Sequence, residues 1–380
     1  MKNPNREYFV PSNTLYSSCL FRSHRSSGAG VTVGLLLLAV LSLLLSGCDR
    51  DGGTTTPEPT PDLGEVGVVV NSVEQTVTLF RVDDPDESPR TVDLQTGGDA
   101  TPVGAAVRGD RALIPLGLYP AAVLVDLKAG QVIRTIGLPQ GSGATGAIFL
   151  TDSTALVANP DRNSVSHLDL EAGSAGMEIE VGRYPQGFVE TDAGIVVINA
   201  ELENFQPAGP GTLTVLDPEA MAVTGEVTLT GQNSNSGVVT SDGRLFILHG
   251  GSWGADDGSL SEVDISLSQE VAHHEGFGDL PSGLTYLDGS LWASSWSFGI
   301  IQWDTESETF VRGPDDPIHP AGIPSSAGLG VDEEGRLYAL TPECQAPGRV
   351  LRLGGDLSVR AEVNVGICPA WVGFGWVDIE

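Results

Sequence analysis

A repeating pattern of about 40–45 residues constrains the fold of this chain more than any other feature. Its clearest copy, residues 147–188, contains three short apolar runs, ALVAN, SVSHLDL and MEIEVG, and then begins a fourth run, GFVE. Clusters of Asn, Asp, Gly and Pro separate the runs, as expected for antiparallel strands joined by tight turns. A four-stranded unit of this length is typical of one blade of a β-propeller.

Two sequence markers recur in step along the chain. The first opens each innermost strand, at spacings of 41 to 50 residues, and falls at Gly104, Gly146, Gly187, Gly237, Gly283, Gly328 and Trp371. The second closes each third strand and falls at Asp83, Asp126, Asp169, Asp217, Asp264, Asp304 and Gly354. We therefore predict an all-β fold, a seven-bladed β-propeller of four-stranded antiparallel blades, over residues 65–380.

The two ends of this region complement each other. Residues 66–95 provide three strands of the first unit, and residues 371–380 provide one strand without a unit of its own. Pairing them would close the ring with one C-terminal and three N-terminal strands (1+3 closure) and leave no open inner edge. Because a lone blade cannot bury both of its faces, we expect the ring to be stable only as a whole.

The N-terminal 47 residues have the layout of a secretory signal peptide. Arg22 and Arg25 precede an uncharged apolar run at residues 31–45, and small residues follow it. An uncleaved anchor helix is the alternative, although residues 31–47 are at the short limit for spanning a bilayer. Residues 48–64, with Cys48 and a Gly/Thr/Pro-rich sequence, are predicted to be a flexible linker.

The run ends in Leu45-Ser46-Gly47-Cys48, which resembles the lipobox of bacterial lipoproteins. The resemblance implies that Cys48 is acylated, with palmitate for example, and becomes the mature N-terminus. It also implies an extracytoplasmic, lipid-anchored location in the cell envelope. The choice between the inner and the outer membrane is left open.

The charge balance excludes one class of partner. The chain carries 19 basic and 50 acidic residues, a net charge of −31. Residues 1–47 contain four of the basic residues and one of the acidic ones, so the remainder holds 15 and 49. Such an acidic protein repels phosphate backbones, and we expect no nucleic-acid partner.

The cysteines are consistent with an oxidising compartment. Cys19 lies in the signal peptide and Cys48 is assigned to the lipid, which leaves Cys344 and Cys368. The first falls in the loop between the second and third strands of the last blade, and the second in the link to the closing strand. These two connections emerge on the same face of a propeller, so we predict a disulfide between them.

The repeat resembles the YVTN-type seven-bladed propellers of bacterial and archaeal surface proteins. The resemblance rests on Val157-Ala158-Asn159, residues 163–169, and Val181-Gly182 before Pro185-Gln186-Gly187. It covers residues 66–380, with degenerate motifs in blades five to seven. It implies an extracytoplasmic propeller and does not imply an enzyme.

Several patterns that suggest chemistry have structural explanations. The repeated Asp residues precede turns and are expected to cap them. Residues 141–146 spell G-x-G-x-x-G but continue into a strand, whereas a dinucleotide site needs a helix there. The six histidines are too few to predict a zinc or copper cluster, and adjacent His273 and His274 would point to opposite sides of a strand. We therefore predict no catalytic residues, metal site or cofactor from these motifs.

Two long loops are the best candidates for a binding site. They join the second and third strands of blades four and five and would lie on the same face of the ring. Their candidate ligand-binding residues are Glu201, Glu203, Phe205, Trp253, Asp256 and Asp257. The carboxylates could hold Ca²⁺, and acids around two aromatic residues could equally contact a protein or a glycan. Two ordinary solvated loops are the remaining interpretation.

The leading hypothesis is a lipid-anchored envelope propeller that acts as a binding or scaffold module with an unidentified ligand. A propeller hydrolase or lactonase with its site at the axial mouth is one alternative, and a purely structural envelope protein is another. The starts of the inner strands are mostly Gly, Ala, Val, Leu and Phe. This composition argues against a crowded catalytic funnel, so we lean towards a protein that is not an enzyme.

Overall fold

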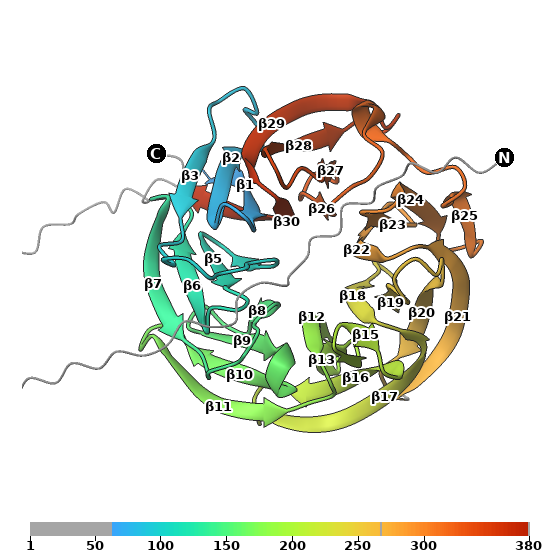
Figure 1. The fold of residues 1–380 in the computed structure, drawn as a ribbon, viewed down its shortest axis with the longest axis horizontal. Coiled ribbons are helices and arrows are strands. Elements are labelled where there is room, and N and C mark those ends of the chain that lie inside the picture. Colours follow the sequence, from blue (N-terminus) through green and yellow to red (C-terminus); the bar gives the residue numbers. More distant parts are fainter. Residues whose placement is uncertain (1–62, 267, 379–380) are drawn as a thin grey trace, which may run out of the picture. The chain divides into compact units, whose positions relative to one another are not determined.

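The computed structural model describes residues 63–266 and 268–378, which form a ring of seven four-stranded antiparallel sheets (Figure 1). The predicted seven-bladed β-propeller is confirmed. The predicted signal peptide, Cys48 and linker residues 49–62 lie outside the described residues. The first strand begins at Leu63, two residues before the predicted start of the propeller. Within the described ranges, no helix is long and apolar enough to cross a membrane.

Six blades are contiguous in sequence, and the first combines both ends of the described chain. Blade 1 contains β30 (Pro369–Asp378), β1 (Leu63–Asn71), β2 (Thr76–Arg81) and β3 (Arg90–Asp93). The strands of the other blades follow, each from the innermost strand outward. Blade 2 contains β4 (Ala106–Arg108), β5 (Arg111–Pro115), β6 (Ala121–Asp126) and β7 (Gln131–Gly137), and blade 3 contains β8 (Ala147–Phe149), β9 (Thr154–Asn159), β10 (Ser164–Asp169) and β11 (Ser174–Glu180). Blade 4 contains β12 (Pro185–Thr191), β13 (Gly194–Asn199), β16 (Pro210–Asp217) and β17 (Ala222–Gln232), and blade 5 contains β18 (Ser234–Val239), β19 (Leu245–His249), β20 (Gly258–Asp264) and β21 (Gln269–Gly278). Blade 6 contains β22 (Pro281–Leu287), β23 (Ser290–Ser295), β24 (Gly299–Asp304) and β25 (Thr309–Arg312), and blade 7 contains β26 (Gly328–Val331), β27 (Leu337–Leu340), β28 (Pro347–Leu353) and β29 (Val359–Ile367).

The ends of the described chain meet in blade 1. Strand β30 pairs antiparallel with β1 from Leu63↔Asp378 to Asn71↔Pro369, and the sheet order is β3-β2-β1-β30. Val372 and Val377 of β30 are each only 5% exposed. The last strand is therefore an integral part of the core and not a tail.

The hydrophobic core lies between neighbouring blades. Phe246 and Leu248 of blade 5, for example, belong to the same buried cluster as Leu291 and Trp303 of blade 6. The rings of Phe246 and Trp303 meet edge to face, with their centroids 5.9 Å apart. Since each apolar face is buried only by the next blade, the blades depend on each other for stability.

Close packing around the axis explains two of the repeated glycines at the start of the inner strands, Gly104 and Gly146. A Cβ atom added at Gly146 would lie 2.4 Å from the carbonyl oxygen of Gln186 in the next blade. Any larger residue at this position would push the two inner strands apart.

The repeated Asp residues cap turns, as the sequence predicts. A carboxylate oxygen of Asp126 accepts a hydrogen bond from the backbone N–H of Ala129 at 2.7 Å, and Asp169 does the same for Ala172 at 2.7 Å. Asp304 accepts from the N–H of Ser307 at 2.7 Å. These carboxylates therefore serve the turns between the third and fourth strands.

An asparagine at the end of the second strand organises three of the blades. Its side-chain amide donates to two hydroxyl oxygens on the third strand, at distances of 2.9 to 3.2 Å, in the sets Asn71 with Thr76 and Thr78, Asn159 with Ser164 and Ser166, and Asn199 with Thr212 and Thr214. Each asparagine is fully buried. Blade 5 has His249 at this position.

The outermost strands are irregular at equivalent places. In six of the seven blades, the pairing between the third and fourth strands shifts register near the start of the fourth strand. In blade 5, Glu262 pairs with Ala272 and Val263 pairs with Glu270, so Val271 is an extra, bulged residue. Such a bulge changes which side chains share a face of the sheet.

Candidate binding face around the ring axis

One face of the ring carries two kinds of connection. The loops between second and third strands emerge there, together with the links from one blade to the next, because successive strands are antiparallel. We call this side the loop face. It displays seven of the large apolar side chains that are more than a third exposed, namely Val73, Val103, Leu118, Tyr119, Phe205, Trp253 and Trp296. Exposed apolar groups gathered on one face are typical of an interaction surface.

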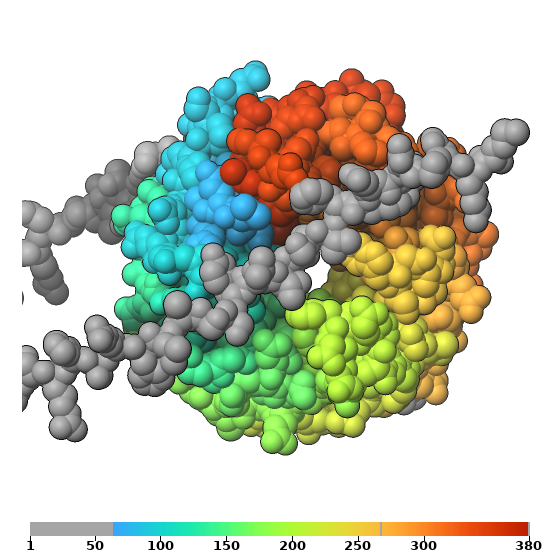
Figure 2. Space-filling view, in the orientation of Figure 1, coloured from blue at the N-terminus to red at the C-terminus, as the bar shows by residue number. Residues whose placement is uncertain are grey.

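A cavity of about 520 Å³ lies at the loop-face end of the ring axis. Figure 2 shows the hollow at the centre of the ring. Its wall consists of the starts of the inner strands and nearby connections, namely Ser72, Val103, Gly104, Ala105, Thr145, Gly146, Ala147, Gln186, Gly187, Phe188, Ile198, Asn235, Ser236, Gly237, Ser282, Gly283, Leu284, Trp296, Ala327, Gly328, Leu329, Cys368, Ala370 and Trp371. None of these lining residues is Asp, Glu, Lys, Arg or His.

The wall of this axial cavity combines polar and aromatic groups. The side-chain amide of Asn235 donates to the carbonyl oxygen of Pro281 at 2.8 Å. Its Oδ1 atom and the Oγ atom of Ser236 are buried and have no hydrogen-bond partner among the described residues. Trp296, on the loop after β23, is 41% exposed. Both oxygen atoms are shielded from solvent, so of these three side chains the one that the cavity exposes is the aromatic ring of Trp296.

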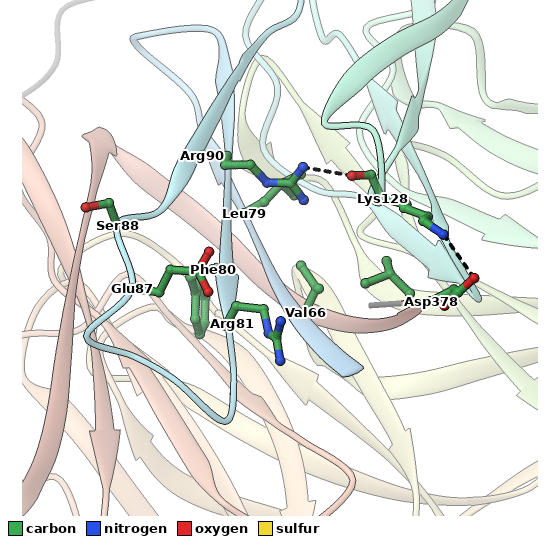
Figure 3. Close-up of a pocket in the computed structure, with 10 residues that line it drawn as sticks. Val66, Leu79, Phe80, Arg81, Glu87, Ser88, Arg90, Lys128 and Asp378 are labelled. Atoms are coloured by element: carbon green, nitrogen blue, oxygen red, sulfur yellow. Dashed lines mark hydrogen bonds and ion pairs between the residues drawn. The ribbon is translucent and has the colours of Figure 1, made fainter. Parts of the chain in front are cut away.

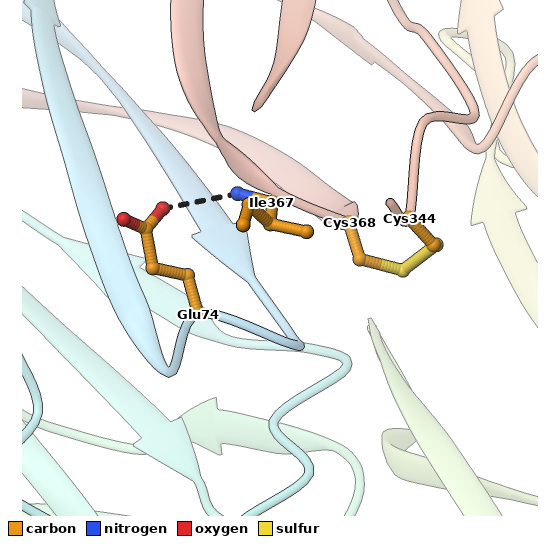
Figure 4. Close-up of a disulfide and its surroundings, with 4 residues drawn as sticks. All are labelled: Glu74, Cys344, Ile367 and Cys368. Atoms are coloured by element: carbon orange, nitrogen blue, oxygen red, sulfur yellow. Dashed lines mark hydrogen bonds between the residues drawn. A yellow bond between two sulfur atoms is a disulfide. The ribbon is translucent and has the colours of Figure 1, made fainter. Parts of the chain in front are cut away.

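The predicted disulfide is confirmed at the edge of this cavity (Figure 4). Cys344, on the loop after β27, is bonded to Cys368, on the link between β29 and β30, and Cys368 also lines the cavity. The backbone N–H of Cys368 donates to the carbonyl oxygen of Glu343 at 2.8 Å, and that of Ile367 donates to Glu74 at 3.0 Å. These bonds attach the closing link to blades 1 and 7.

The long loop of blade 4 holds its own acidic residues. A small hairpin, β14 (Leu202–Glu203) with β15 (Gln206–Pro207), forms within it. Glu201 accepts hydrogen bonds from the Arg183 backbone N–H at 3.1 Å and the Thr212 hydroxyl at 2.8 Å. Glu203 lies 3.8 Å from the Arg183 guanidinium. The two carboxylates therefore attach the loop to its own blade.

Phe205, from the same loop, remains accessible. Its side chain is 73% exposed, and its ring meets the edge of Tyr184 with centroids 6.1 Å apart. Phe205 and Glu203 line a second hollow of about 460 Å³ between blades 3 and 4, next to Asp161 and Arg183. Two of the predicted residues therefore share a site, but this site lies off the ring axis.

The long loop of blade 5 is arranged independently. Asp257 accepts a hydrogen bond from the backbone N–H of Ser252 at 2.7 Å. The backbone N–H of Gly254 donates to Asp279 at 2.8 Å. Asp256 has a left-handed backbone with φ of 52°, and Trp253 is 69% exposed.

Among the described residues, the group of His, Cys, Asp and Glu side chains close enough to hold a metal ion is His249, Glu270 and His273. The acidic residues of the two long loops do not belong to it. The structure thus does not bring Glu201, Glu203, Asp256 and Asp257 together as one Ca²⁺ cage. The histidine group is a feature that the sequence prediction missed.

A charged pocket of about 300 Å³ lies between blades 1 and 2, at the turns that join third and fourth strands, opposite the loop face (Figure 3). Its two best-placed cations are already engaged. Arg90 donates to the carbonyl oxygen of Lys128 at 2.8 Å, and the Lys128 ammonium lies 3.0 Å from Asp378. These contacts across the pocket therefore connect blades 1 and 2.

The fold and the axial cavity place the chain in a broad structural class, the seven-bladed β-propellers. No family model and no curated protein matches its sequence. Among solved structures, it is similar to hydrazine synthase of Kuenenia stuttgartiensis, with a TM-score of 0.56 and 14% identity over 73% of this chain and 91% of that one. It is also similar to virginiamycin B lyase from Staphylococcus aureus, with a TM-score of 0.53 and 14% identity over 72% of this chain and 86% of that one. At this identity, the similarity establishes the fold alone.

Proposed function

We propose that this chain is a lipid-anchored binding module of the bacterial cell envelope that takes an uncharged saccharide at its axial cavity. The observation that carries the proposal is the composition of the cavity wall, which is uncharged but holds amides, hydroxyls and aromatic rings. Ligand sites of this volume are mostly apolar, with a few polar groups that fix the orientation of the ligand.

The chemistry of the wall fits a neutral sugar. The faces of sugar rings carry C–H groups that pack on aromatic surfaces such as Trp296, while hydroxyls need both donors and acceptors. Gln186 supplies an amide that both donates and accepts, and Ser72 and Ser282 supply hydroxyls. An anionic or cationic ligand would find no opposite charge on this wall, so an uncharged ligand is favoured.

The same composition argues against the hydrolase or lactonase alternative. A general acid or base must lie within hydrogen-bond reach of the proton that it transfers. The described residues that line the cavity include hydroxyl groups but no carboxylate, imidazole or amine side chain. Binding is therefore favoured over hydrolysis at this site.

The proposed location follows from the N-terminal sequence. A lipid on Cys48 would hold the ring at a membrane surface by the predicted linker, and attachment through more than one acyl chain is stable. The excess of acidic over basic residues disfavours contact with anionic lipid heads. A ring tethered away from the bilayer could present its loop face to the envelope.

A protein partner is the second candidate, favoured by a different observation. Phe205 and Trp253 are 73% and 69% exposed on the loop face, outside the axial cavity. Aromatic side chains in such positions often anchor protein interfaces.

Two exposed tryptophans on neighbouring blades allow a direct test. The full-length chain, purified in detergent, would be titrated calorimetrically with neutral oligosaccharides prepared from bacterial envelopes. Trp296 lines the axial cavity, whereas Trp253 does not. We expect Trp296→Ala to weaken binding by about tenfold, the equivalent of losing roughly 1.4 kcal/mol of aromatic contact, and Trp253→Ala to leave it unchanged.

The result decides between the proposals. Binding that is lost in Trp253→Ala and kept in Trp296→Ala would contradict the axial site and favour the outer loops. An absence of heat with every neutral saccharide would contradict the saccharide assignment. Turnover of an ester or lactone by the wild-type chain, lost in a cavity variant, would revive the hydrolase alternative.

A further inference from the structure

The joint between blades 4 and 5 contains two imidazoles and a carboxylate that converge on one atom. The Oγ atom of Ser261, on β20, lies 2.6 Å from His249 Nε2 and 3.3 Å from His273 Nδ1. It also donates a hydrogen bond to Glu270 Oε1. The distance between His273 Nδ1 and Glu270 Oε1 is 3.5 Å. The three potential ligand atoms all lie within 4.8 Å of one another.

This donor set matches the preferences of one class of metal. Two imidazole nitrogens and a carboxylate oxygen are ligands found around zinc and similar divalent transition-metal ions. The hydroxyl oxygen of Ser261 lies among them and would take the fourth position by releasing its hydrogen bond to Glu270. We propose that His249, Glu270 and His273, together with Ser261, form a binding site for one zinc-class divalent ion.

The groups behind the ligands support this assignment. Metal-binding imidazoles and carboxylates are usually oriented by further hydrogen bonds. The Nδ1 atom of His249 lies 2.9 Å from the hydroxyl of Ser234. Glu270 Oε2 accepts from the backbone N–H of Thr230 at 3.0 Å and from its hydroxyl at 2.6 Å. Two of the three ligands are therefore held in place before any ion arrives.

Burial and hydrogen bonds act in opposite directions on two of these groups. Burial lowers the pKa of His249 to about 3, so its ring is neutral at neutral pH. Burial alone would raise the pKa of Glu270, but hydrogen bonds from Ser261 and Thr230 outweigh it and keep the pKa below its usual value.

Access from solvent is also available. His249 is fully buried, whereas the side chains of Glu270 and His273 are 14% and 18% exposed. Glu270 belongs to β21 of blade 5, and its partner Thr230 belongs to β17 of blade 4. An ion at this place would therefore reach the ligands from the outer rim and reinforce the joint between two blades.

Comparison with blade 3 shows what is special about blade 5. Asn159 pairs with Ser164 across the strands, as His249 pairs with Ser259, so Asn159 and His249 are equivalent. Two residues further along the third strand, Ser166 of blade 3 pairs with Glu178, whereas the equivalent Ser261 of blade 5 pairs with His273. Two positions that carry non-histidine residues in blade 3 thus both carry histidine in blade 5, and they face the same serine.

This equivalence supplies a variant that removes a ligand with little change in fold. In His249→Asn, the amide can donate to third-strand hydroxyls as Asn159 does to Ser164 and Ser166. The control is His167→Asn, which makes the same substitution on β10, outside the cluster. Both variants would be compared with the wild-type full-length chain in detergent, after chelator treatment and dialysis.

The measurement is calorimetric titration with ZnCl₂, followed by absorption spectroscopy with Co²⁺ to detect imidazole ligands. We expect one Zn²⁺ per wild-type chain, unchanged binding in His167→Asn, and binding weakened at least 100-fold in His249→Asn. The metal-free His249→Asn chain should retain the wild-type circular dichroism spectrum. Glu270→Gln, which keeps an acceptor for Thr230, should weaken binding in the same way if His249→Asn fails to fold.

Three results would overturn the site. These are the absence of saturable Zn²⁺ binding by the wild-type chain, equal affinity in wild type and His249→Asn, and loss of binding in the His167→Asn control. None of these outcomes depends on the saccharide proposal, because the cluster is separate from the residues that line the axial cavity.

Discussion

Removing the disulfide between Cys344 and Cys368 should lower the melting temperature of the ring by about 5 °C. The bonded residues are 24 positions apart. In the chain-entropy model, closing a loop of this length stabilises the folded state by about 3.4 kcal/mol at 25 °C. For the compact unit Pro59–Glu380, an unfolding entropy of ~2.1 cal/mol/K per residue gives roughly 0.7 kcal/mol/K in total. The ratio of these two values is the expected shift.

The assay is thermal unfolding of wild type and a Cys344→Ser/Cys368→Ser double variant, each with and without dithiothreitol. Reductant provides a matched control, because it should lower the melting temperature of wild type to that of the double variant. It should leave the double variant unchanged. Equal melting temperatures for oxidised wild type and the double variant would refute the reasoning, as would an effect of reductant on the variant.

Three other predictions concern the two ends of the chain and one buried acid. Ending the chain after Ala370 removes all but the first two residues of β30, including buried valines that are worth roughly 1.5–3 kcal/mol each. This change should lower the melting temperature of the whole ring, and a transition equal to wild type would contradict it. Cys48→Ser should move the chain from the membrane to the soluble fraction in bacterial fractionation, unless residues 31–47 are an uncleaved anchor. Burial raises the pKa of Glu65 above its ordinary 4.5, so its protonation favours folding at low pH and this contribution is lost as the pH rises. In denaturant titrations, the free energy of unfolding of Glu65→Gln relative to that of wild type should therefore be higher at about pH 7 than at about pH 4. An equal difference between the two proteins at both pH values would argue against this.

The blade count and the disulfide could be predicted because they follow from local rules repeated along the chain. Where an innermost strand passes close to the backbone of its neighbour, it requires a small residue such as Gly146. Each turn after a third strand needs a side-chain acceptor such as Asp126. The position of Cys344 and Cys368 then follows from which connections share a face.

The histidine cluster could not be predicted because strict alternation places its members on different faces. Glu270 and His273 are three residues apart, so in a regular strand their side chains would point in opposite directions. The extra residue Val271 brings them to the same side. One signal was available, because aligning the ends of second strands places His249 where Asn71 and Asn159 stand.

The long loops show a second limit of sequence analysis. Both lie on the loop face as predicted, but their acidic side chains bond to their own blades and to an adjoining link, and not to each other. Glu201 binds Thr212 and the backbone of Arg183, and Asp257 binds the backbone of Ser252. Strand order determines which side of the ring a loop occupies, whereas the contacts of its side chains depend on loop conformation.

Occupancy of the axial cavity by the ligand can be measured by hydroxyl-radical footprinting of the full-length chain with and without a neutral envelope oligosaccharide. Trp296 and Trp371 line the cavity, whereas Trp253 is exposed outside it. We expect the oligosaccharide to reduce oxidation of Trp296 and Trp371 and to leave that of Trp253 unchanged. Protection of Trp253 without protection of Trp296 and Trp371 would contradict this expectation.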